Sequence, residues 1–169
     1  MGYLNDTGFA QFIPTGAVLT SGGTYSNTIL SGGLVYRQRT AADAAFTIAM
    51  PVAIPSNNGI RKGCLLKSVE FLYQISTAEL DAITPVELYK IAFAADGTPT
   101  ATEIGITLNA DALSSALRKT VAYHRIVATL NTPVWVDNDA TYNLRIDLDG
   151  SATGVFRIFG GIANFTLSA

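Results

Sequence analysis

Residues 142 to 149 read Tyr-Asn-Leu-Arg-Ile-Asp-Leu-Asp, so every second side chain is apolar. Because successive side chains of a β-strand point to opposite faces, this pattern predicts a strand with one face in a core and the other in solvent. The stretch from Val69 to Ile75 alternates in the same way, with Leu72 as the one apolar residue on its polar side. Such half-buried strands are typical of antiparallel sheets, since strands of parallel sheets are usually apolar on both faces.

Further strands are expected on either side of these two, separated by turn signals. The turns are marked by Ser56-Asn57-Asn58-Gly59, Ala95-Asp96-Gly97-Thr98, Gly150-Ser151 and Gly160-Gly161. One short helix or loop is expected over residues 109–119, where Asp111 would cap the start and Arg118-Lys119 would suit the end. Roughly eight strands without helix–strand alternation predict an all-β fold, an antiparallel two-sheet β-sandwich with a jelly roll as its candidate topology.

Charged residues make up 14% of the chain, against about 25% in an ordinary soluble domain. The net charge is −2, from 11 basic and 13 acidic side chains. A surface so poor in charge predicts that neighbouring subunits cover much of it, so we expect a homo-oligomer formed by self-assembly. The alternative is a monomer that is simply rich in threonine, alanine and glycine.

Composition also argues against several other classes of protein. Basic residues are not clustered, so direct binding to nucleic acid is not expected. No stretch approaches the ~20 apolar residues of a membrane helix, and the first residues lack the regions of a signal peptide. Cys64 is the single cysteine, which excludes an intrachain disulfide and a cysteine-based zinc site.

Residues 1–33 differ from the rest of the chain and are interpreted as an extended arm, with the sandwich domain over residues 34–169. The arm is rich in Gly, Ser and Thr, and Asp6 is its one charged residue. Its apolar side chains need a partner surface: Phe9, Phe12, Ile13, Val18, Leu19, Ile29 and Leu30. An arm laid across a neighbouring subunit would provide one. The alternative is an ordinary set of first strands and loops packed on their own domain.

The sequence offers little for catalysis. His124 is the only histidine, and its alternation with Ile126 and Ala128 places it on an apolar face, where a buried, hydrogen-bonded histidine is expected. There is no Gly-x-Ser-x-Gly elbow, phosphate loop or dinucleotide fingerprint. We therefore expect no enzyme activity, no catalytic residue, no cofactor and no bound metal.

The acidic turn around residues 137–139 is the strongest candidate for a ligand site. Trp135 and Tyr142 flank Asp137 and Asp139, so these four residues form a candidate ligand platform. Carboxylates at this spacing could also hold Ca²⁺, and with Asp147 and Asp149 could serve a glycosidase. Solvated turn and strand residues are the alternative. Tyrosines on or near strands could extend a platform or lie in the core: Tyr25, Tyr36, Tyr73, Tyr89 and Tyr123.

Several segments after residue 60 resemble β-sandwich virion proteins of tailed bacteriophages. They are residues 66–78 (LKSVEFLYQISTA), 80–84 (LDAIT), 86–90 (VELYK), 94–98 (AADGT), 137–147 (DNDATYNLRID) and 160–167 (GGIANFTL). The resemblance covers residues 60–169 and leaves the arm outside.

The resemblance implies a structural protein of a phage particle. We expect a capsid decoration or cement protein that contacts the major capsid protein, acts by subunit contacts and arm exchange, and is assembled in the host cytoplasm into the virion. The first alternative is a tail-fibre or adhesin-like module that binds carbohydrate through aromatic residues near Trp135 and Tyr142. A polysaccharide-degrading enzyme is the remote alternative.

Overall fold

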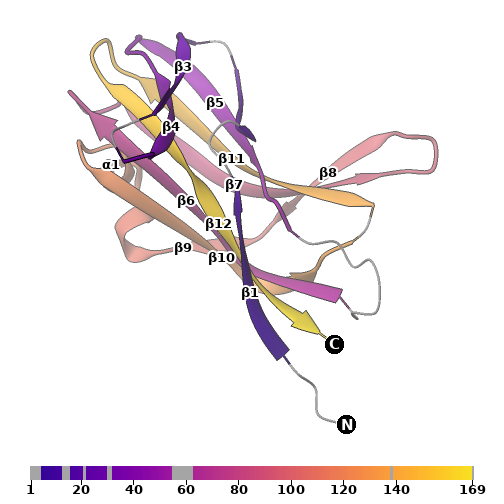
Figure 1. The fold of residues 1–169 in the computed structure, drawn as a ribbon. Coiled ribbons are helices and arrows are strands. Elements are labelled where there is room, and N and C mark those ends of the chain that lie inside the picture. Colours follow the sequence, from indigo (N-terminus) through magenta and orange to yellow (C-terminus); the bar gives the residue numbers. More distant parts are fainter. Residues whose placement is uncertain are drawn as a thin grey trace.

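The computed structural model describes residues 5–12, 16–20, 22–29, 32–54, 63–137 and 139–168. In this part of the chain twelve strands form two antiparallel sheets that pack face to face (Figure 1). The predicted β-sandwich is confirmed. No helix among the described residues has the length and apolar character needed to cross a membrane.

Sheet A, the larger layer, contains seven of these strands. They are β1 (Asn5–Phe12), β3 (Tyr25–Ile29), β4 (Val35–Arg39), β6 (Gly63–Ser76), β9 (Ile106–Leu108), β10 (Tyr123–Trp135) and β12 (Val155–Ser168). The order across the sheet is β3-β4-β12-β6-β10-β9, and β1 pairs with the second half of β12. Strands from both ends of the chain therefore meet in the middle of this sheet.

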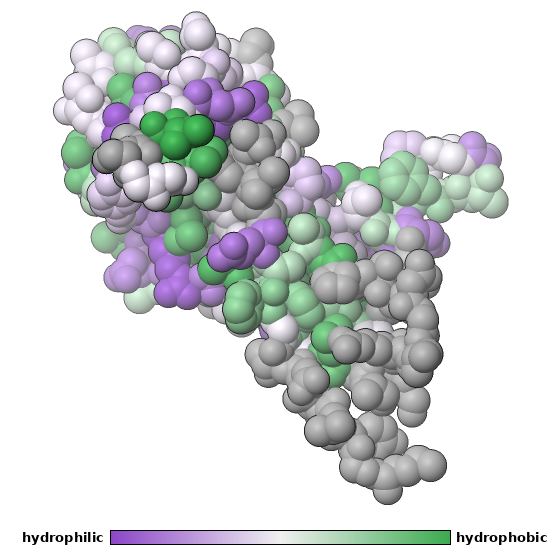
Figure 2. Space-filling model, viewed as in Figure 1, coloured by the Kyte–Doolittle hydropathy of each residue, from purple (hydrophilic) through white to green (hydrophobic). Residues whose placement is uncertain are grey.

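Sheet B, the smaller layer, has the order β2-β5-β11-β7-β8. Its strands are β2 (Val18–Leu19), β5 (Ala44–Pro51), β7 (Ala82–Phe93), β8 (Pro99–Ile104) and β11 (Ala140–Gly150). Gly105 alone separates β8 from β9, so the chain changes sheets at that residue. The β7–β8 hairpin extends beyond the body of the sandwich (Figures 1 and 2).

The core lies between the sheets and is built by the alternation seen in the sequence. Every second residue of β11 from Tyr142 to Leu148 is buried, and the same holds for β6 from Val69 to Ile75. At the centre the ring of Phe156 stacks on that of Tyr73, with centroids 5.1 Å apart. Apolar burial of this kind is the dominant force that holds two sheets together.

The segment before β10 forms two short helical turns, the 3₁₀ turn η2 (Ala110–Ala112) and the helix α1 (Ser115–Arg118). The predicted start at Asp111 is wrong, because Ser114 caps α1 by accepting a hydrogen bond from Leu117 N. Arg118 is buried instead of facing solvent, and its guanidinium donates to the carbonyl oxygens of Ile83 and Ala112. These bonds attach the two turns to the edge of sheet B.

The described parts of residues 1–33 pair with strands of the same chain. β1 pairs with β12, β2 with β5 and β3 with β4, which matches the alternative of first strands packed on their own domain. Of the predicted arm residues, Phe9 and Ile29 are both 71% exposed, whereas Leu19 packs against the core. The side chains of Phe12 and Val18 and all of Ile13 and Leu30 lie outside the described residues. A boundary at residue 33 stays a prediction.

Candidate functional site

The outer face of sheet A, the side turned away from sheet B, presents a row of polar side chains that ends in an exposed tyrosine. Gln38 on β4 lies opposite Arg157 on β12, and Arg157 lies opposite Gln74 on β6, which in turn lies opposite Tyr123 on β10. Residues of β6 next to this row, such as Tyr73, point into the core, so Gln74 must point outward. Four strands thus contribute to one surface.

Arg157 is held in place within this row. Its Nε donates to Gln38 Oε1 at 2.8 Å and its Nη1 donates to Gln74 Oε1 at 2.9 Å. The guanidinium also lies over the ring of Tyr36, 5.3 Å from the centroid, where a cation is attracted by the electrons of the ring. The planar group is therefore fixed by three neighbours.

An aromatic groove lies beside the row. The ring of Phe159 contacts those of Tyr36 and Tyr123, with centroids 5.9 Å apart in both pairs. Tyr36 is buried, but Tyr123 is 70% exposed. The groove has a volume of about 370 Å³, and its walls are Leu34, Leu72, Tyr73, Tyr123, His124, Arg125 and Phe159.

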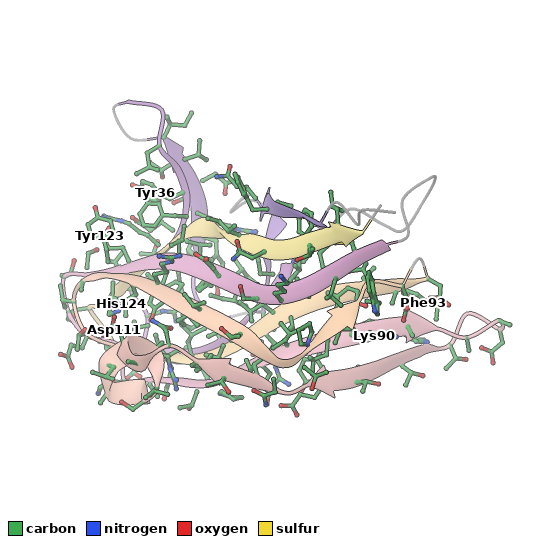
Figure 3. The ribbon with its side chains drawn as sticks, turned by 90° about the horizontal axis from the view of Figure 1, so that it is seen from below. Tyr36, Lys90, Phe93, Asp111, Tyr123 and His124 are labelled. Carbon is green, nitrogen blue, oxygen red and sulfur yellow. The ribbon has the colours of Figure 1, made fainter. Side chains whose placement is uncertain are left out.

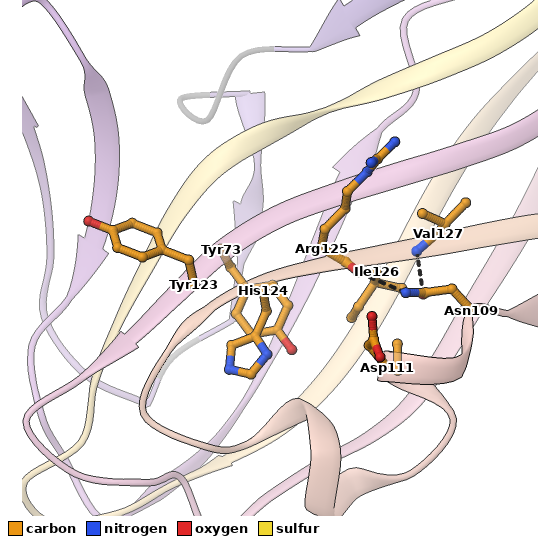
Figure 4. Close-up of a pocket in the computed structure, with 9 residues that line it drawn as sticks. Tyr73, Asn109, Asp111, Tyr123, His124, Arg125, Ile126 and Val127 are labelled. Carbon is orange, nitrogen blue, oxygen red and sulfur yellow. Dashed lines mark hydrogen bonds between the residues drawn. The ribbon is translucent and has the colours of Figure 1, made fainter.

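A second hollow, of about 420 Å³, lies on the edge side of β10 (Figure 4). Four residues line both hollows: Tyr73, Tyr123, His124 and Arg125. Asn109 closes one end of it. Its Nδ2 donates to Arg125 O and its Oδ1 accepts from Val127 N, so the amide takes the place of a neighbouring strand. Beyond Asn109 no described strand pairs with this edge of β10, and the carboxylate of Asp111 lies beside it.

His124 occupies the position that the sequence predicts, on the core side of β10 and hydrogen-bonded. Its Nε2 lies 2.7 Å from Thr120 O and must donate there, because a carbonyl oxygen can only accept. The ring stacks on Tyr73 with centroids 4.8 Å apart, and the hydroxyl of Tyr73 donates to Arg118 O. Burial raises the pKa of Tyr73 well above its ordinary value. The two rings therefore pack together on the core side of sheet A, at the end of the sandwich that also carries Tyr36 and Tyr123 (Figure 3).

A second polar network borders the groove on the same face. Arg125 Nε donates to Glu70 Oε2 at 2.7 Å, and Asn164 Nδ2 donates to Glu70 Oε1 at 3.0 Å and to Ser68 Oγ at 3.1 Å. The hydrogen bond from Arg125 holds the pKa of Glu70 below its ordinary value, with Asn164 adding to the effect and burial opposing it. Glu70 is therefore ionised at neutral pH.

The predicted ligand platform is only partly exposed. Trp135 is 50% exposed, but Tyr142 is only 3% exposed, so its ring cannot serve as a stacking surface. The alternation that predicts the strand also directs Tyr142 into the core. Asp137 forms an ion pair with Lys90, and Asp139 is exposed in the turn. Trp135 lies opposite Leu65 of β6, nine positions from Gln74, and so about 30 Å from Tyr123.

Of the other acidic candidates, Asp149 is exposed and Asp147 is engaged elsewhere. Asp147 accepts hydrogen bonds from Thr47 Oγ1 and from Arg145 on the outer side of sheet B. Among the residues that the structure describes, no group of three metal-ligating side chains comes together. No sequence pattern singled out Gln38, Gln74, Arg125, Arg157 or Phe159. The assignment of His124 to the apolar face does, however, place Tyr123 and Arg125 on the opposite face.

No protein-family model matches the chain, and no curated protein does. Several solved structures are similar in fold. One is a CBM61 carbohydrate-binding module in complex with beta-1,4-galactotriose, at 10% identity and a TM-score of 0.39 over 93% of this chain and 86% of that one. Another is the family 11 module of a cellulosomal cellulase of Clostridium thermocellum, at 10% identity and a TM-score of 0.43 over 92% and 94%. At these values the likeness concerns the β-sandwich architecture alone.

The predicted relationship to virion sandwiches of tailed phages is wrong. The similar structures reported above are carbohydrate-binding modules, and no family model or curated protein supports a phage assignment. The function as a capsid decoration or cement protein that acts by arm exchange is corrected with it. The virion location and the contact with a major capsid protein lose their basis, since both depended on that resemblance.

Proposed function

We propose that this protein binds carbohydrate on the outer face of sheet A, in the groove between Tyr123 and Phe159. The observation that carries the proposal is the exposed ring of Tyr123 above a groove whose borders hold planar polar side chains in fixed positions. Ligand sites combine apolar walls with a few well-placed polar groups in this way.

The chemistry of a sugar suits this surface. One face of a pyranose ring presents C–H groups, and these are attracted to the electron-rich face of an aromatic ring such as Tyr123. The hydroxyl groups at its rim both donate and accept, and can pair with the amides of Gln74 and Asn164 and with the guanidinium of Arg125. The protein thus offers a counterpart to both parts of the ligand.

The existing hydrogen bonds also favour binding. Gln38, Gln74 and Arg157 already support one another, as do Arg125, Glu70 and Asn164. Side chains that are ordered before the ligand arrives lose less conformational entropy when it binds. A face preorganised in this way stabilises a complex even though each single contact with a hydroxyl group is weak.

The groups at the site are suited to binding rather than to hydrolysis. A glycosidase needs one carboxyl group that is protonated near neutral pH as a general acid. Glu70 is the buried carboxylate of the face, and its pKa lies below the ordinary value because Arg125 donates to it. His124 commits one ring nitrogen to Thr120 O and stacks on Tyr73. We therefore propose recognition without bond cleavage.

The test is a glycan array followed by calorimetry on the sugars that bind. Replacing Tyr123 with alanine removes the exposed stacking surface and should weaken binding about tenfold or more. The matched control is Trp135→Ala, which removes another exposed aromatic ring about 30 Å away on the same face. Binding that is lost in the Trp135 variant and kept in the Tyr123 variant would place the site at the acidic turn instead. An array on which the wild-type protein binds nothing would disprove the function.

A further inference from the structure

We propose that the sugar bound on this face carries a carboxylate, as uronic acids do, and that Arg157 receives it. The proposal rests on the proposed carbohydrate-binding function and adds the chemical class of the ligand. It follows from the two arginines on this face, because an acidic side chain neutralises one of them and not the other.

Two arginines lie beside the groove, and they differ in the charge of the side chains that they contact. Arg125 is neutralised by an ion pair with Glu70. Arg157 instead donates to the neutral amide oxygens of Gln38 and Gln74, and no acidic side chain of the described residues forms an ion pair with it. The face therefore keeps one positive charge that no acidic side chain of the described residues neutralises.

The contacts of Arg157 leave it able to accept a ligand. The amides use Nε and Nη1, while Nη2 makes no hydrogen bond to any described residue. Tyr36 supports the flat side of the guanidinium. A guanidinium has five N–H donors in a rigid plane and pairs with a carboxylate through two parallel hydrogen bonds. Because the two amides are neutral, they fix the orientation of the guanidinium and leave its positive charge available to a ligand.

The position of Arg157 fits a sugar that stacks on the groove. Phe159 lies at a bulge of β12, and Tyr36 contacts both Phe159 and Arg157, so these two side chains lie on the same face. Gln74 separates Arg157 from Tyr123 in the row, and strands lie about 4.8 Å apart, which puts Arg157 about 10 Å across the sheet from Tyr123. An oligosaccharide stacked on Tyr123 and Phe159 can reach Arg157 with a substituent of its next sugar unit.

The experiment compares each acidic oligosaccharide with its own neutral form. Oligomers of galacturonic, glucuronic and mannuronic acid are presented beside the same oligomers after reduction of their carboxyl groups to alcohols. The wild-type protein should bind at least one acidic oligomer about tenfold more tightly than its reduced form, because a charge-assisted hydrogen bond replaces a neutral one. Added salt should reduce the difference.

Two variants connect the preference to Arg157. Arg157→Gln should bind the acidic and the reduced oligomer equally, whereas Arg157→Lys, which keeps the charge and loses the planar donor pair, should retain part of the preference. Arg145→Gln is the control, since it removes a charge from the outer side of sheet B, where Glu87 and Asp147 already neutralise it. Circular dichroism melts show whether each variant is folded.

The outcomes separate this inference from the proposed function. Equal binding of acidic and reduced oligomers by the wild-type protein disproves the role of Arg157 and leaves carbohydrate binding intact. A preference that survives in Arg157→Gln assigns the carboxylate to another cation and also overturns the inference. Failure of the wild-type protein to bind any glycan of the array overturns the function itself.

Discussion

Glu70 shows how a single side chain connects stability with the candidate site. It is 6% exposed and accepts hydrogen bonds from Arg125 and Asn164. Arg125 itself is well exposed, so solvent weakens the attraction between the two charges. The carboxylate nevertheless has donors on both oxygens, which is why it remains charged beneath the surface.

Replacing Glu70 with glutamine should lower the free energy of unfolding by about 1 kcal/mol at pH 7, because a hydrogen bond to a neutral group replaces a charge-assisted one. The folded-state pKa of Glu70 lies below the ordinary value of 4.5, so the contribution of the charge is present above pH 4.5 and is lost as the pH falls through the lowered pKa. Urea unfolding at pH 7 and pH 3 measures the difference between wild type and variant, which should shrink at pH 3. Glu103→Gln, at an exposed position, is the control and should change little at either pH.

At the level of single residues, the sequence predicted which face of a strand a side chain occupies better than it predicted the hydrogen-bond partners of that side chain. It placed His124 on the core side of its strand correctly, and the same alternation sends Tyr142 inward and Tyr123 outward. It could not predict that Arg39 and Arg118 are buried, because the groups that accept hydrogen bonds from their guanidinium groups are carbonyl oxygens, which every residue has. Arg39 donates to Gly22 O and Ala42 O, and no side-chain pattern marks such partners.

Among the elements, β1 depends on one glycine for its place beside β12. Gly8 lies opposite Phe165, and the ring of Phe165 covers it so closely that an added Cβ would lie 2.5 Å from a ring carbon. Contacts under 3.0 Å require a shift of the strand or of the ring, and Phe165 belongs to the core. Gly8 is therefore a packing requirement rather than a sign of a flexible arm.

Replacing Gly8 with alanine should destabilise the protein by about 1–3 kcal/mol, as expected when a group is forced into a well-packed core. Gly16→Ala is the matched control, since nothing lies within 4 Å of the position of its Cβ. Thermal melts of both variants measure the effect. Hydrogen exchange of β1 should increase in the Gly8 variant alone, and equal behaviour of the two variants would contradict the packing argument.

Strand positions followed from the sequence, whereas the order of strands in the sheets did not. Alternation over residues 69–75 and 142–149 predicted two strands that are present as β6 and β11. The site, however, requires Gln38 to lie beside Arg157, more than a hundred residues later. Pairing at such separation depends on how all the strands fit together, and no local pattern records it.

The prediction of a homo-oligomer stays untested, and the β7–β8 hairpin offers one specific surface through which two copies could pair. β8 is the edge strand of sheet B, its residues are mostly exposed, and Glu103 is its one charged side chain. Ala94 N donates to Thr98 O, so these two residues form a hydrogen-bonded pair. Hydrogen-bonded and non-hydrogen-bonded pairs alternate along an antiparallel ladder, which makes Ile91 and Ala101 a non-hydrogen-bonded pair. Ala101 therefore directs its own N–H and C=O away from β7. An unpaired edge of this kind can pair with the same edge of a second copy.

Sedimentation velocity over a range of concentrations tests this pairing. The wild-type protein should show a concentration-dependent dimer, and Ala101→Pro should remain a monomer because it removes an outward N–H without disturbing the hairpin. A dimer that persists in the Ala101 variant would exclude β8 as the contact. A wild-type protein that is monomeric at all concentrations would favour the alternative of a charge-poor monomer.

At the scale of the whole molecule, the two sheets differ in where their strands come from along the chain. Sheet B is built from residues 18–150. Sheet A has β12 in its interior, with β6 on one side and β4 and β1 on the other. The row of Gln38, Arg157 and Gln74 therefore exists only when three distant parts of the chain have met.

The position of β12 has a consequence for the order of events during synthesis. β1, β4 and β6 all precede β12 in the chain and pair with it, so they leave the ribosome before the strand that joins them. Until then the apolar sides of both sheets lack a complete opposite layer, and the nascent chain exposes the surfaces that chaperones bind. The sandwich is therefore expected to fold only after β12 has left the ribosome, and the face proposed to bind sugar cannot form before that point.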